Sequence, residues 1–273
     1  MWEKLLRLLW HISAASLLVG SLIAPASAGC TGAVADMRAP LRLAAATGAD
    51  DVSLSFLGHA SFLIESPGGV RIVTDYNDAI RAPVTPDIVT MNNAHPTHYS
   101  NVVESGVKFI LRGWDPAGGV ASHRVDYRDV HIHNVATNLR EPGVREPGVR
   151  ESMTRYDGNS IFVFDVADLC IAHLGHLHHT LTGSHLAALG AIDVVLVPID
   201  GAFTLNQNDM IATLQQLKPK IVIPMHIFTL AKLDLFIARA AGLYTVRRAA
   251  GASVVLSRAG LPAQPEILIL AGM

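Results

Sequence analysis

Short β-rich segments bounded by turns occupy the first half of the chain, and helices alternate with strands in the second half. Val52–Leu57, Ser61–Glu65 and Val70–Thr74 are typical strands, separated by a glycine and by a Pro-Gly-Gly turn. This order favours an α/β fold in which two sheets pack together with helices outside them, within one domain. The other expected strands are Asp87–Met91, Lys108–Leu111, Val130–His133, Ile161–Val166, Leu169–Ala172, Asp193–Pro198, Ile221–Pro224, Val254–Ser257 and Ile267–Leu270, and the expected helices are Thr182–Leu189, Asn208–Leu217 and Leu230–Ala241.

The composition narrows the class of protein. Half of the 273 residues are apolar and only 16% are charged, which is enough for a sizeable core and excludes a disordered chain. The net charge is −2 and the basic residues are spread thinly, so we expect no nucleic-acid partner. The chain has 13 histidines but only 5 tyrosines and 3 tryptophans. Because histidine is the commonest metal ligand, this excess is the first functional hint.

The N-terminus has the features of a secretory signal peptide. Lys4 and Arg7 precede an apolar stretch at residues 12–24, and Ala26-Ser27-Ala28 is a small-residue cleavage site. The apolar stretch is short for a membrane span, which needs about 20 residues. An uncleaved membrane anchor is the alternative.

We therefore expect residues 1–28 to be a signal peptide, 29–50 an Ala- and Gly-rich linker, and 51–273 a single exported domain, periplasmic or secreted. Membrane attachment is expected only if Cys30 is acylated, as in a lipoprotein. Cys170 lies in an apolar run and is expected to be a buried, inert thiol. A disulfide between the two cysteines would nevertheless be permitted outside the cytoplasm.

A tandem repeat of Arg-Glu-Pro-Gly-Val falls within residues 140–151. A period of five that carries Pro-Gly cannot form a solenoid unit and indicates an exposed loop. A binding loop beside a site is the functional alternative.

Aspartate or histidine side chains follow five of the expected strands. In α/β architectures the carboxyl ends of strands meet at one edge, where ligand sites form. A lone histidine is more often packed or solvated than a ligand, but the whole set indicates a shared site. Its members are Asp75, His95, His98, His173, His176, Asp200 and His226.

The segments that carry these residues match known sequence patterns in order. They are Leu57-Gly58-His59-Ala60-Ser61-Phe62-Leu63-Ile64-Glu65, Ile72-Val73-Thr74-Asp75, Asp87–Asn101, His173-Leu174-Gly175-His176, Asp193–Pro198, and Leu217 to His226. They resemble the metallo-β-lactamase superfamily, in particular its small-hydrolase branch that includes sugar-lactone hydrolases. The likeness covers about residues 52–230. It implies an α/β fold of the αββα four-layer sandwich type, with a metal site on one edge.

The chain departs from the family pattern at three ligand positions. The family's His-x-His-x-Asp-His is here Asn93-Ala94-His95-Pro96-Thr97-His98, and its later His-x-Gly-Asp ends in His176. The resemblance implies His95, His98, His173 and His226 as metal ligands. We expect His176 to replace a lost ligand, although it could merely fill space. His59 and Asp75 are expected to orient the ligands from behind, since metal-bound histidines usually donate their second N–H to such groups.

In this family two zinc ions share a hydroxide that attacks an ester, amide, lactone or phosphoester. Three histidines and a water suffice for a catalytic zinc ion, and two close dications without a bridging carboxylate would repel each other. We therefore expect one Zn²⁺, with other divalent metals as alternatives, and a metal-bound water as nucleophile. Asp200 either assists as ligand or base or is a turn residue before Gly201, and with His176 it is the expected catalytic residue.

The function expected from the sequence is an exported, zinc-dependent hydrolase that acts on a small-molecule ester, lactone or phosphoester. One alternative is a non-catalytic protein of the same fold that binds a metal or a small ligand. Another is a relative that has lost its metal. The histidines outside the pattern, His123, His131, His133, His178 and His179, are expected to be loop residues in solvent.

Overall fold

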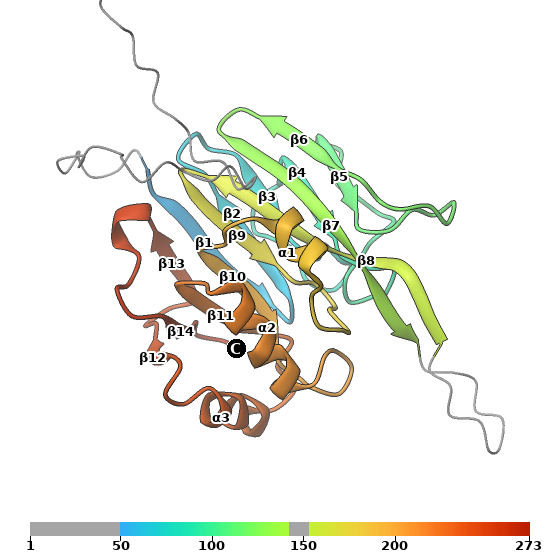
Figure 1. Ribbon diagram of the computed structural model, residues 1–273. Helices are drawn as coiled ribbons and strands as arrows, with labels where there is room; N and C mark the ends of the chain where they lie inside the picture. Colours follow the sequence, from blue (N-terminus) through green and yellow to red (C-terminus); the bar gives the residue numbers. More distant parts are fainter. Residues whose placement is uncertain (1–49, 142–152) are drawn as a thin grey trace, which may run out of the picture.

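The computed structural model describes residues 50–141 and 153–273 (Figure 1). The expected signal peptide, the linker, Cys30 and most of the tandem repeat lie outside these residues and stay predictions. Within the described part, no helix is both long and apolar enough to span a bilayer.

Two mixed sheets face each other. The six-stranded sheet has the order β13-β1-β2-β3-β4-β5, and the eight-stranded sheet has the order β12-β14-β11-β10-β9-β8-β7-β6. Strands β3 to β5 run parallel, as do β9, β10, β11, β14 and β12, whereas the β6 to β9 segment is antiparallel. The strands are β1 (Val52–Gly58), β2 (Ser61–Glu65), β3 (Arg71–Val73), β4 (Ile88–Met91), β5 (Phe109–Arg112), β6 (Arg124–Tyr127), β7 (Val130–Glu141), β8 (Met153–Val166), β9 (Leu169–His173), β10 (Val194–Pro198), β11 (Ile221–Met225), β12 (Thr245–Arg248), β13 (Ser253–Leu256) and β14 (Glu266–Ile269).

The main core lies between the sheets and follows from the alternation of side chains along each strand. Phe62 and Ile64 of β2 point inward and meet Phe162 and Phe164 of β8. Their neighbours point to the opposite faces, so Val163 of β8 joins a second core beneath the helices. Both faces of each sheet are therefore apolar, as a layered sandwich requires.

The two outer faces are covered differently. Helices α1 (Gly183–Leu189), α2 (Gln207–Leu217) and α3 (Leu230–Arg239) pack on the eight-stranded sheet, with residues such as Leu214 and Phe236 buried there (Figure 1). On the six-stranded sheet, Tyr76 and Trp114 from connecting segments cover Leu63, Val73 and Val89, and no described helix lies there. The α/β sandwich predicted from the sequence is confirmed, with its helices gathered on one side.

The expected elements recur within two residues at each end, except for two strands that are longer, and two further strands were missed. Strands β6 and β12 were not expected, and β7 and β8 extend well past the predicted segments into a long hairpin arm (Figure 1). Strand β12 is exposed throughout and carries little apolar signal. Polar residues such as Asn134 and Thr137 interrupt the apolar residues along this arm, so a search for apolar segments does not detect its full length.

Cys170 of β9 is buried and disulfide-bonded. The expectation of a free, inert thiol at this position is therefore wrong. Cysteine is small and apolar enough to pack in a core in either redox state, so its apolar context could not distinguish the two.

Candidate metal centre

The site forms at the edge where the carboxyl ends of β4, β9, β10 and β11 meet the turn between β1 and β2. His59 occupies this turn and His226 follows β11, and both have positive φ values, 53° and 56°. The peptide N–H of His226 donates to the carbonyl oxygen of His59 at 2.8 Å, which joins the two loops. As a result their rings lie only 4.2 Å apart between centroids. The strained backbone of His59 and His226 thus brings their two imidazoles together.

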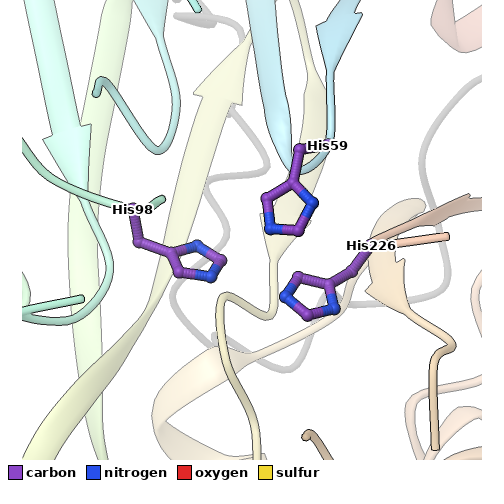
Figure 2. Close-up of side chains that lie close together, drawn as sticks. All are labelled: His59, His98 and His226. Atoms are coloured by element: carbon purple, nitrogen blue, oxygen red, sulfur yellow. The ribbon is translucent and has the colours of Figure 1, made fainter. Parts of the chain in front are cut away.

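Three histidines, His59, His98 and His226, form a cluster of possible metal ligands. One ring nitrogen from each lies within 4.8 Å of the other two (Figure 2). The Nε2 atoms of His59 and His98 are buried and have no hydrogen-bond partner in the described structure. A buried polar atom without a partner is costly, so its presence calls for an explanation. A bound metal ion would supply the missing partner, and three imidazoles are a set that zinc accepts.

Buried carboxylates hold two of these rings from behind. The Nδ1 of His98 lies 2.6 Å from Oδ2 of Asp75, and the Nδ1 of His226 lies 3.1 Å from Oδ2 of Asp200. Both carboxylates are almost fully buried. A proton on Nδ1 leaves Nε2 of each ring with a lone pair, as a metal ligand requires.

The surroundings of His59, His98 and the neighbouring His176 favour their neutral forms. Burial, together with the neighbouring His226 and His98, lowers the pKa of His59 to about 4. Burial also holds the pKa of His98 well below its usual range. The pKa of His176 falls to about 2, again mainly through burial and then through His98 and His226. Neutral imidazoles keep the lone pairs that a dication needs.

The two carboxylates differ in their surroundings. Burial raises the pKa of Asp75 to about 6, although His173 and the peptide N–H of Asn92 act in the opposite direction. Burial would also raise the pKa of Asp200, but hydrogen bonds from His226, Thr204 and two peptide N–H groups hold it well below its usual range. Asp200 is therefore an ionised anchor for His226. Its lone pairs are engaged by these donors, which leaves it poorly suited to accept a proton in the cavity.

His173 lies outside the cluster. Its Nε2 lies 2.8 Å from the carbonyl oxygen of Ala60, and its Nδ1 accepts from the peptide N–H of Gly175 at 3.1 Å. Both ring nitrogens are thus engaged by backbone groups in a fully buried position. In this arrangement His173 ties the end of β9 to the turn that carries His59.

His95 and His176 lie beside the cluster without joining its three-nitrogen group. The ring of His176 is 4.9 Å from that of His98 and 5.1 Å from that of His226, both edge-on. His95 is exposed, its ring lies 5.8 Å from His98, and its Nδ1 pairs with Oγ1 of Thr97 at 2.9 Å. Ligation by these two residues stays a prediction.

Sequence reasoning assigned His59 a supporting role, yet its free nitrogen faces the cluster. It also expected His178 to be solvated, which is wrong. Its Nε2 lies 2.6 Å from Nδ1 of His176, and its Nδ1 accepts from the peptide N–H of Arg140. His131 does lie exposed on the surface, but it and His133 belong to strand β7 and not to a loop. The Gly58-His59 pair was the available signal for the first case, whereas no local pattern shows that the β7 arm reaches His178.

A cavity of about 700 Å³ opens above the cluster. Phe203 and Phe228 form one wall, with 63% and 55% of their surface exposed, and their rings contact each other at 5.5 Å. Arg140 and Arg155 of the β7–β8 arm contribute to the lining, and no described carboxylate does. The cavity thus combines imidazoles, an apolar wall and cationic groups.

Together, the two packed mixed sheets and the histidine cluster at their edge define a metallo-β-lactamase-type sandwich. A sequence profile described as a beta-lactamase superfamily domain matches residues 53–226. The chain therefore belongs to the metallo-β-lactamase superfamily.

Individual relatives agree with this assignment. The chain is 28% identical over 194 residues to a UPF0173 metal-dependent hydrolase of Thermococcus kodakarensis, covering 64% of this chain and 84% of the relative. A solved metallo-β-lactamase superfamily structure from Thermotoga maritima is 26% identical with a TM-score of 0.57, covering 80% of this chain and 98% of that one. Igni18, a metallo hydrolase from Ignicoccus hospitalis, shares the fold with a TM-score of 0.53 and 19% identity, covering 76% of this chain and 99% of its own.

Proposed function

We propose that the protein is an exported, metal-dependent hydrolase with a single metal site held by His59, His98 and His226. The observation that carries this proposal is the convergence of three imidazole nitrogens, two of them buried without a partner among the described residues. The similar proteins from Thermococcus and Thermotoga support it, because the first is named a metal-dependent hydrolase and the second is named for zinc dependence.

Zinc is the proposed metal, since three histidines with one open position are a common catalytic zinc set. A bound zinc ion supplies a water of lowered pKa and polarises the oxygen of the scissile bond. Asp75 and Asp200 keep the rings of His98 and His226 in the required orientation and tautomer.

One ion is proposed rather than two. The family's metal-binding carboxylates are replaced by Thr97 and His176, and no described carboxylate lines the cavity. Two adjacent dications would then repel each other with little compensation. The lack of a carboxylate base in the lining also favours the second candidate, a non-catalytic protein that binds a metal or a small ligand.

The proposed substrate is a small ester, lactone or phosphoester with an apolar group. Phe228 contacts the rings of both His226 and His59, at 5.0 and 5.7 Å between centroids. An apolar group packed on Phe203 and Phe228 would therefore lie directly beside the metal ligands. Its burial would contribute about 25 cal/mol per Å² of apolar surface.

The test is metal content and turnover of protein purified without an affinity tag. Substitution of His59, His98 or His226 by alanine should remove the metal, whereas His131→Ala should not, because His131 is exposed and pairs with Asp126 on the surface. Full metal occupancy in all three cluster variants would refute the assignment. Chelator-sensitive hydrolysis of generic esters, lactones or phosphodiesters supports the hydrolase, and metal binding without such turnover supports the second candidate.

Export is proposed from the signal peptide pattern at residues 1–28. The disulfide at Cys170 supports it, because disulfides persist mainly in oxidising compartments. Intact mass of the protein from a secreting host should give a chain that begins near Gly29. Recovery of only the full-length chain from the cytosol would refute this part of the proposal.

A further inference from the structure

His176 occupies the position of the family's metal-binding aspartate, and two contacts from outside the cluster hold this residue, one at its backbone and one at its ring. Its peptide N–H donates to Oδ1 of Asn159 at 2.9 Å, which fixes the loop after β9 against β8. Its Nδ1 lies 2.6 Å from Nε2 of His178. Two imidazole nitrogens at this distance share one proton, so the tautomers of the two rings depend on each other.

The hydrogen bond at Nδ1 of His178 determines which nitrogen of each ring carries the proton. The peptide N–H of Arg140, in the β7 strand, points to Nδ1 of His178 at 2.7 Å. A peptide N–H can only donate, so Nδ1 of His178 must accept and carries no proton. A neutral His178 then has its proton on Nε2 and donates it to Nδ1 of His176. A neutral His176 must in turn carry its own proton on Nε2.

The Nε2–H of His176 belongs to the ring nitrogen that does not contact His178. His176 lines the cavity and packs edge-on against His98 and His226. Its nitrogens lie outside the three-nitrogen group of His59, His98 and His226. A protonated nitrogen has no lone pair for a metal ion, but it can donate to an oxygen of a bound molecule.

We infer that His176 is a hydrogen-bond donor into the cavity, not a metal ligand, and that His178 is the positioning residue that sets its tautomer. The donor's target is the oxygen of an ester, lactone or phosphoester that gains negative charge during hydrolysis. This last point rests on the proposed function, because a donor fixed in advance beside the reacting centre stabilises such an oxygen. The exchange of aspartate for histidine thus changes an anionic ligand into a neutral donor.

The tautomers can be read directly by ring-15N NMR of the metal-free and the zinc-loaded protein at pH 7. His176 and His178 are both expected to carry the proton on Nε2. His179 provides the opposite internal standard, because its Nε2 accepts from the peptide N–H of Asn138 at 3.0 Å and its Nδ1 faces the carbonyl oxygen of Thr180 at 2.9 Å. A proton on Nδ1 of His176, or a zinc-induced loss of its Nε2 proton, would overturn the inference.

Variants separate a donor from a ligand. His176→Leu and His176→Gln should both keep one zinc per chain, while turnover falls roughly 100-fold in the leucine variant and less in the glutamine variant, whose amide can donate. His178→Leu should release the tautomer of His176, and His178→Gln should retain it. His179→Leu is the matched control, since His179 also accepts from a β7 peptide group but has no bond to His176. Stoichiometric zinc loss in both His176 variants would identify a ligand and refute the inference.

The two proposals can fail separately. If neither wild type nor variants hydrolyse any ester, lactone or phosphodiester, the proposed hydrolase function fails. The proton position on His176 and the zinc stoichiometry still decide whether this residue is a donor or a ligand.

Discussion

Asp75→Asn tests whether a buried carboxylate prepares His98 for a metal. In the native protein Oδ1 of Asp75 accepts from the peptide N–H of Asn92 at 3.0 Å, and Oδ2 faces Nδ1 of His98 at 2.6 Å. An asparagine can keep only one oxygen. If that oxygen stays on Asn92, the amide N–H faces His98, whose proton then moves to Nε2, the nitrogen that faces the cluster.

The expected loss has two parts. Removing a partner behind a metal-bound histidine typically weakens metal affinity 10- to 100-fold, which is about 1.4–2.7 kcal/mol. If the asparagine instead turns its oxygen to His98, the peptide N–H of Asn92 is left without an acceptor. One unsatisfied buried donor costs about 1–3 kcal/mol of folding stability. Metal affinity, metal-free stability or both should therefore fall.

The matched control is Asp126→Asn. Asp126 faces Nδ1 of His131 at the same 2.6 Å, but both side chains are well exposed. Such a surface pair contributes about 0–1 kcal/mol and has no link to the cluster. Zinc titration calorimetry measures affinity, and urea denaturation with chelator measures metal-free stability. Equal zinc affinity and equal stability in the two variants would refute the assigned role of Asp75.

Three further predictions follow from the same geometry. Burial lowers the pKa of His59 to about 4 and also lowers the pKa of six other histidines. Between pH 6.5 and 4 the unfolded chain therefore binds more protons than the folded chain. The metal-free protein should lose stability as pH falls from 7 to 5. The raised pKa of Asp75, about 6, acts in the opposite direction but is one group against seven, so a higher urea midpoint at pH 5 would contradict this prediction. Gly175→Ala should lower the free energy of unfolding by several kcal/mol, because Gly175 has φ +59° and a Cβ there would lie 2.3 Å from Nδ2 of Asn92. Gly183→Ala has open space around the added Cβ and should be nearly neutral, and a thermal melt compares the two variants. Phe228→Ala should raise KM several-fold for apolar esters with little change in metal content, and an unchanged KM would place the substrate elsewhere.

Most of the fold could be predicted because its information is local. The continuous apolar run of β2 and the mixed apolar pattern of α2 identify these elements from a few adjacent residues. The full length of the β7–β8 arm was not predicted, because the strands of its outer half pair at polar positions, such as Thr137 with Asn159. Its stability comes from the partner strand, which a single segment does not reveal.

For the site, the sequence predicts where the histidines lie but not what their ring nitrogens contact. The place of His98 after β4 and of His226 after β11 was predictable, because polar residues at the carboxyl ends of neighbouring strands must share an edge. His173 follows the same rule, yet both of its nitrogens are engaged by backbone groups, one of them 113 residues away in the chain. Position in a strand therefore does not show whether a nitrogen is free.

By itself, the sequence determined the superfamily, the sandwich of sheets and the edge at which its histidines gather, because these depend on patterns within short segments. The tertiary structure decided which histidine nitrogens face the cluster, that His59 is one of them, and how His178 sets the proton on His176. The physical reason is that an imidazole has two nitrogens, and the hydrogen bond at one determines what the other can do. Those bonds come from Asp75, Asp200 and Arg140, which lie far along the chain from the rings they orient.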